Sequence, residues 1–130
     1  MAAMTMKKTL GDLVKREFSH DYCRETVTLV AQPGGYPMGA ILGKDSTTGK
    51  FAFSPATAAE PADGTEVACA VLLEHVSSEE EVAAALVMMR GPVILADTAL
   101  EFDVGVNSDE LKEKKKQELS ACGLVVRQTV

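Results

Sequence analysis

The sequence predicts a small α+β domain, rich in β-structure, with about six or seven short strands, one C-terminal helix and a flexible N-terminal arm. Short runs of β-branched and apolar residues recur between turn residues, which is typical of strands. Only one segment, near the C-terminus, has the cap and charge order of a helix. A chain of 130 residues corresponds to one domain. Because aromatic residues are 5% and Trp is absent, the core has to be aliphatic and rich in alanine.

The N-terminal part, residues 1–21, is expected to form the flexible arm ahead of a single domain, residues 22–130. Met1–Lys8 offers little to bury, and the apolar anchors of the next ten residues are Leu10, Leu13, Val14 and Phe18. Their spacing fits a marginal amphipathic turn, which is too short to hold a helix alone because nucleation is costly. We therefore expect the arm to order against a partner surface, and its removal to leave the domain folded.

Most of the predicted strands are bounded by turn signals. They are Tyr22–Val30, Met38–Leu42, Lys50–Phe53, Thr65–Val76, Val93–Leu95 and Leu124–Arg127. The second and third should form a hairpin around the turn Asp45–Gly49, and Ser54–Gly64 should be a surface loop. Val82–Met89 is apolar throughout and is consistent with either a buried strand or a helix.

The helix is predicted from its ends. Asn107 or Ser108 can cap it, acidic residues follow in the first turn, and lysines come later, which suits the helix macrodipole. Gly123 lies where the helix should end. The charge runs Glu79–Glu81 and Lys114–Lys116 are interpreted as solvated faces.

Charge excludes several classes of function. The net charge is −6, divided into +1 over residues 1–32 and −7 over the remainder, and the pI is near 4.9. A chain this acidic is unsuited to nucleic acid or an anionic membrane surface. Cys23, Cys69 and Cys122 are far apart and odd in number, which indicates neither a disulfide framework nor a zinc site. With no apolar run of signal-peptide or membrane-span length, we expect synthesis in a reducing cytoplasm.

The glycine-rich stretch and the His and Cys residues do not match the spacing of known phosphate-binding or catalytic motifs. Gly39 and Gly43 enclose three residues where a phosphate loop needs four, and Asp45 follows Lys44 where a hydroxyl residue is required. His20 and Cys23 would point to opposite faces of an extended segment. The sequence therefore predicts no catalytic residue, no cofactor, no metal and no small-molecule substrate.

Taken in order, the residues resemble the phage head decoration proteins of the lambda D type. The likeness runs from Asp12 to Val130 and rests on order and spacing. Its features are Asp12–Phe18 leading into Tyr22–Leu29, Met38–Lys44 with its turn, Thr65–Val76 leading to Val87–Pro92, and a helix from Ser108 followed by Gly123–Arg127.

The resemblance implies a structural protein of the virion. It implies a homotrimer on the outer surface of the expanded head, at three-fold sites, which clamps neighbouring major capsid subunits and performs no reaction. It further implies that the arm, with Leu10, Leu13, Val14 and Phe18, orders on the capsid by adding a strand beside a capsid segment.

Two other interpretations stay open at this stage. One is a small hydrolase or ligand-binding barrel that uses Cys23 with His20 or His75. The other is a general phage structural adaptor that shares the β-rich pattern.

Overall fold

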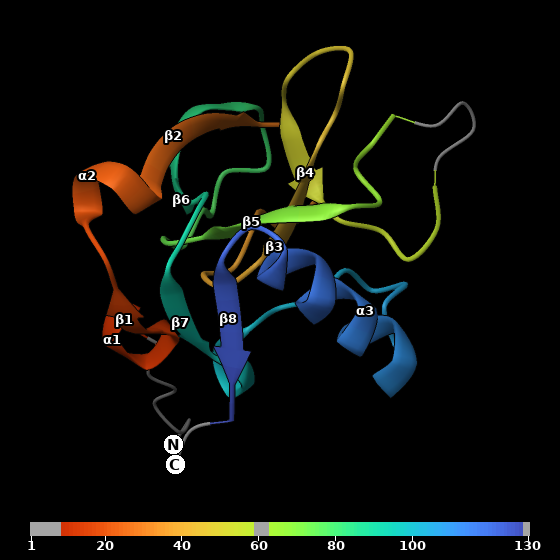
Figure 1. Cartoon of the computed structure of the whole chain (residues 1–130). Helices are drawn as coiled ribbons and strands as arrows, with labels where there is room; N and C mark the ends of the chain where they lie inside the picture. The colour runs from red at the N-terminus through yellow and green to blue at the C-terminus, as the bar shows by residue number, and fades with distance from the viewer. Residues whose placement is uncertain (1–8, 59–62, 129–130) are drawn as a thin grey trace, which may run out of the picture.

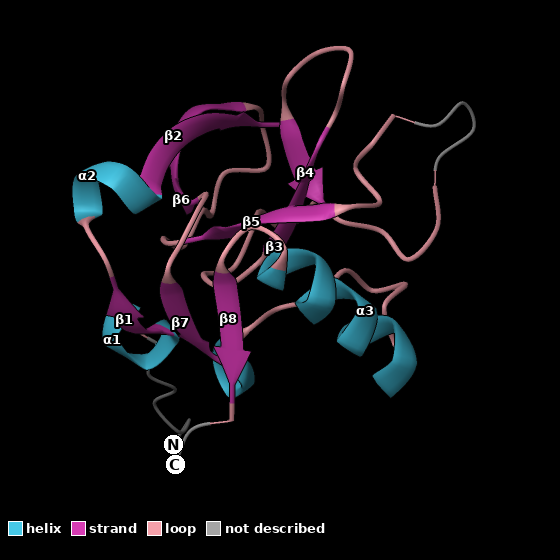
Figure 2. Ribbon diagram, viewed as in Figure 1, coloured by secondary structure: helices cyan, strands magenta, loops and turns pink. Residues whose placement is uncertain are grey.

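The computed structural model describes residues 9–58 and 63–128. It contains two sheets and one long helix, arranged around a shared core (Figures 1 and 2). The strands are β1 Val14–Glu17, β2 Arg24–Leu29, β3 Ile41–Lys44, β4 Phe51–Phe53, β5 Ala68–Leu72, β6 Val82–Met88, β7 Val93–Ala96 and β8 Leu124–Arg127. The helices are the single turns α1 Leu10–Leu13 and α2 His20–Cys23, the 3-10 turn η1 Asp97–Ala99, and α3 Asp109–Ser120. The predicted β-rich α+β class is confirmed.

Five strands close into a barrel, in the order β2-β4-β3-β5-β6. The predicted hairpin is the antiparallel pair β3 and β4, and Asp45 Oδ1 accepts the backbone N–H groups of Thr47 and Thr48 in its turn. The sequence is consistent with either a strand or a helix over Val82–Met89. This segment forms strand β6, which pairs antiparallel with both β2 and β5. A barrel interior demands this extended backbone, which outweighs the local helix preference of Ala and Met.

The remaining three strands form an open sheet, in the order β1-β7-β8, which we call the end sheet. β1 pairs antiparallel with β7, and β7 pairs parallel with β8. β1 was missed from the sequence, where an amphipathic turn was expected; the helical turn ends at Leu13 and the chain continues extended. One face of the end sheet packs towards α3 and the barrel, so the sheet shares the protein's main core.

Two apolar clusters hold these parts together. The first fills the barrel and includes Leu29, Leu42 and Val87. The second lies between the barrel, the end sheet and α3, and includes Leu13, Ile41, Leu95, Leu119 and Leu124. Both clusters are mainly aliphatic with several alanines, as the composition predicts.

A buried lysine joins α3 to the barrel. Lys115 is 2% exposed, and its ammonium donates to Ser54 Oγ at 2.9 Å and to the Glu66 carbonyl at 2.6 Å, with Glu118 Oε1 at 3.6 Å. Burial lowers the pKa of Lys115, an effect that the neighbouring Glu118 carboxylate opposes. The expectation that all three lysines of residues 114–116 are solvated is therefore wrong for Lys115, because distant polar groups satisfy its charge.

Ser108, rather than Asn107, caps α3: its hydroxyl accepts the Leu111 N–H.

β5 is shorter than the predicted strand Thr65–Val76. Residues 65–67 form a turn instead, in which the Val67 N–H donates to the Gly64 carbonyl. In the described part of the chain, no helix is long and apolar enough to cross a membrane.

Candidate functional site

The end sheet is the part of the fold with open strand edges. The barrel closes on itself, whereas β1 and β8 each have one side that no described strand pairs with. Unpaired strand edges expose backbone donors and acceptors and are ready sites for another chain. The end sheet is therefore the first place to look for a protein-binding surface.

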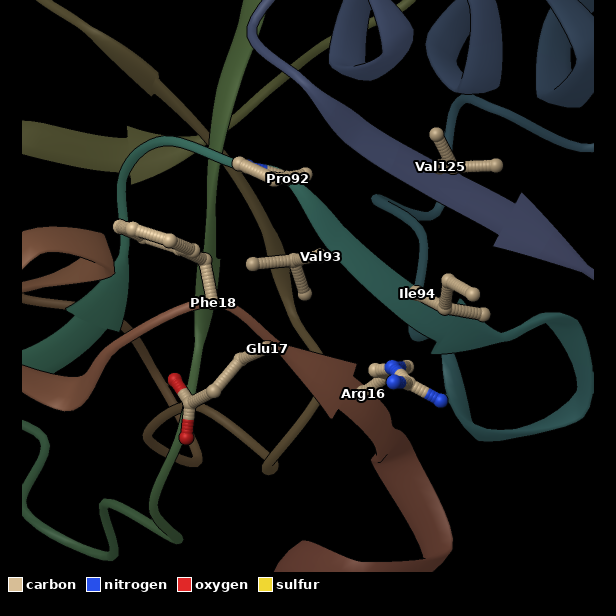
Figure 3. Close-up of a pocket in the computed structure, with 7 residues that line it drawn as sticks. All are labelled: Arg16, Glu17, Phe18, Pro92, Val93, Ile94 and Val125. Atoms are coloured by element: carbon tan, nitrogen blue, oxygen red, sulfur yellow. The ribbon is translucent and has the colours of Figure 1, made fainter.

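An apolar groove of about 350 Å³ lies on the outer face of this sheet (Figure 3). Arg16, Ile94 and Val125 stand in a row across the three strands, because Arg16 pairs with Ile94 and Ile94 pairs with Val125. Phe18 and Pro92 line the same groove beyond the strand ends. Phe18 is 70% exposed and Val125 is 37% exposed, so the groove presents apolar area to solvent.

An aromatic and cationic cluster extends this groove. Phe18 and Tyr22 meet edge to face with ring centroids 6.1 Å apart, and the Arg90 guanidinium lies 5.5 Å from the Tyr22 ring centre. Arg90 also donates to Glu25 Oε1 at 2.7 Å and to the Tyr22 carbonyl at 2.6 Å. Phe18 and Tyr22 are exposed and the Arg90 side chain is 35% exposed, and Phe, Tyr and Arg are residue types found at the centres of protein interfaces.

The four predicted arm residues have different positions. Leu13 is fully buried in the main core, and Leu10 and Val14 are half-buried against it. Phe18 alone of the four is exposed, beside the groove. In this conformation, three of the four anchors stabilise the protein's own fold, and Phe18 is the one available to a partner.

The Glu17 carboxylate, at the end of β1, holds the following turn through contacts with two other side chains. Glu17 pairs with Arg24, and His20 Nδ1 lies 3.3 Å from Glu17 Oε1. These contacts, with the Phe18 N–H bond to the Pro92 carbonyl, fix where Phe18 projects. Sequence reasoning found Phe18 but missed Tyr22 and Arg90, since nothing local indicates that residues 68 positions apart meet.

The structure does not assemble the alternative Cys/His site. Cys23 is fully buried, whereas the His20 side chain is 76% exposed and faces Glu17. The His75 Nδ1 accepts the Met38 N–H at 3.4 Å, on the barrel. Burial also raises the pKa of the Cys69 thiol, which disfavours its reactive thiolate. Among the residues described, no cluster of three or more His, Cys, Asp or Glu could hold a metal ion.

The open edges, the groove and the aromatic cluster have the features of a protein-docking domain. The chain belongs to the family of the bacteriophage lambda head decoration protein D, whose model matches residues 3–124. This match confirms the resemblance found in the sequence and assigns the chain to the structural proteins of phage heads, with the capsid as the kind of partner. A search of curated proteins gave no match.

Proposed function

We propose that this protein binds as a homotrimer at three-fold sites on the outer surface of the expanded phage head and clamps neighbouring major capsid subunits. The observation that carries the proposal is the family match across residues 3–124. The open end sheet and its exposed aromatic cluster support it, because they offer backbone pairing and apolar contact on one side of the molecule. The protein would be made in the host cytoplasm and act on the virion surface.

The stabilising effect would come from binding alone, without a reaction. A protein that binds the expanded shell and not a ruptured one stabilises the shell by about 2.7 kcal/mol per site at a hundredfold excess over Kd. Three linked copies strengthen attachment, since each bound copy raises the effective concentration of the next.

The N-terminal segment would supply part of the capsid contact. Phe18 can contact the capsid in the conformation described, because it is 70% exposed. Leu10, Leu13 and Val14 could reach the capsid only if the segment left the core that now buries them. Binding of the N-terminal segment to the capsid therefore has two separable parts. Phe18 could contact the capsid directly, whereas Leu10, Leu13 and Val14 could do so only after β1 is released from the core.

Decoration can be tested with heads that lack this protein. Expanded and unexpanded heads are mixed with the wild-type chain and examined by electron microscopy and by sedimentation of bound protein. We expect saturable binding at three-fold positions of expanded heads only. Absence of binding to either form would contradict the proposal.

Phe18 can be tested in the same assay. Phe18→Ala should weaken binding by about tenfold or more, the size of an interface hot spot. Val104→Ala is the matched control, because Val104 is 94% exposed but lies between η1 and α3, away from the groove. Equal binding by both variants would show that Phe18 does not contact the capsid.

A further inference from the structure

The chain has four arginines, and two of them lie on the end sheet without an ion pair. Arg24 and Arg90 each pair with a glutamate. Arg16 of β1 and Arg127 of β8 are exposed, and neither has an ion-pair partner among the described residues. A chain of net charge −6 thus keeps unpaired positive charge on two strands of one sheet.

Both arginines are on the outer face of the end sheet. Arg16 pairs with Ile94, and Ile94 pairs with Val125, so these three side chains stand on the same side of the sheet (Figure 3). Arg127 comes two residues after Val125 in β8 and therefore projects to that side as well. Leu124, on the opposite side of the same strand, is fully buried in the core.

Apolar side chains separate the two charges. Ile94 and Val125 lie between the arginines, and Phe18 extends the groove beyond the strand ends. Among the described residues that line the groove, Glu17 alone carries a carboxylate, and it is 11% exposed and paired with Arg24. The face therefore offers apolar contact with a free guanidinium at each end.

We infer that this face binds an apolar segment of the major capsid protein that carries acidic residues on either side of its apolar side chains. The inference rests on the proposed function for the identity of the partner. It adds which face of the chain meets the capsid and the chemistry of the contact. Arginine suits such a partner because its planar guanidinium binds a carboxylate through two parallel hydrogen bonds, while the apolar strip between the charges is desolvated.

A second copy of this chain fits the face less well. If the same face of two copies met, Arg16 and Arg127 of both would enter one interface whose lining carboxylate, Glu17, already has a partner. Such a contact between like surfaces also has two-fold symmetry and does not close a trimer. The family match, by contrast, supports the capsid as the kind of partner.

Charge reversal tests the inference on expanded heads that lack this protein. Arg16→Glu and Arg127→Glu should each weaken binding of the full chain by about tenfold or more. Lys114→Glu is the matched control, because it changes the net charge equally at an exposed cation of α3 that also lacks an ion-pair partner in the described chain. Added salt should weaken binding of the wild type more than that of the double variant Arg16→Glu/Arg127→Glu, since salt screens the attraction that the variant has lost.

A cross-link gives a second readout that keeps the positive charge. Arg16→Lys should bind heads nearly as the wild type does, and it places an amine where a carbodiimide can couple it directly to a carboxylate. Mass spectrometry of decorated heads should then find an amide between position 16 and an Asp or Glu of the major capsid protein. No cross-link from Lys114 to the capsid protein is expected.

The outcomes separate this inference from the proposed function. Single charge variants that bind heads as Lys114→Glu does would overturn the inference alone. So would a cross-link from position 16 only to another copy of the chain, or loss of the free trimer by Arg16→Glu or Arg127→Glu in analytical ultracentrifugation, because the face would then be covered by a second copy. A wild-type chain that binds no heads would contradict the proposed function, and the inference with it.

Discussion

The Lys115 ammonium lies 2.9 Å from the Ser54 hydroxyl, although the two residues are 61 positions apart, and this contact fastens α3 to the barrel. Lys115→Met should lower the free energy of unfolding by about 2–4 kcal/mol, because it leaves buried polar groups without their donor. Denaturant titration of Lys115→Met and of Lys114→Met checks this. Lys114 is exposed on the same helix, so its variant should stay within about 0.5 kcal/mol of the wild type. Equal stability of the two variants would contradict the role given to Lys115.

Substitution of Leu13 tests whether the N-terminal segment with β1 packs against the core in the free protein. If β1 is docked in the free protein, Leu13→Ala should cost about 2–5 kcal/mol of stability, since Leu13 is fully buried. Phe18→Ala should change stability by no more than about 0.5 kcal/mol. Thermal or urea unfolding of the free protein measures both, and a Leu13→Ala variant as stable as the wild type would show that the segment is detached.

The burial of Leu13 also affects what should happen when the N-terminal segment is deleted. Deletion of residues 1–20 removes Leu13 together with β1 and uncovers the edge of β7. The structure therefore leads us to expect a destabilised domain, the opposite of what the sequence led us to expect. Substitution of Phe18 is the cleaner way to separate binding from folding.

Tyr36 should make the protein sensitive to alkaline pH. Its buried hydroxyl donates to the Val30 carbonyl at 3.0 Å, and burial raises the pKa of Tyr36 to about 12 from 10.0. The unfolded chain loses the phenol proton first, so stability falls as the pH rises from 10 towards 12, by about 1.4 kcal/mol per pH unit for this group. Tyr36→Phe should have a shallower decline over that range. Parallel slopes for the two proteins in urea titrations at pH 9 to 11.5 would contradict this.

Gly43 is required by a close approach of two backbones. A Cβ atom at this position in β3 would overlap the Thr65 carbonyl. Gly43→Ala should therefore cost at least about 1–3 kcal/mol, as overpacking does. Gly11→Ala is the control, because its nearest neighbour would be Thr9 Oγ1 at an ordinary 3.8 Å. A Gly43→Ala variant as stable as Gly11→Ala would show that the β3 backbone can move.

The elements predicted well from the sequence are those whose cause is local. Ser108 with Asp109 and Glu110 marks the start of α3, and the Asp45–Gly49 turn marks the β3–β4 hairpin. β1 was missed because Val-Lys-Arg-Glu has no strand alternation, and β7 supplies the pairing that makes it extended. The burial of Lys115 depends on Ser54 and Glu66, which only the folded chain brings near. The same holds for the candidate site: Phe18 was found as an apolar anchor, but its meeting with Tyr22 and Arg90 is a product of the fold.

The shared core has a mechanical consequence. Ile41 of the barrel and Leu95 of the end sheet belong to one apolar cluster, and Lys115 adds a polar tie on the α3 side. Tension applied to β1 or β8 would therefore spread into the barrel instead of peeling off the sheet. Under the proposed function, a pull from a capsid subunit on either strand would be shared by the end sheet, α3 and the barrel.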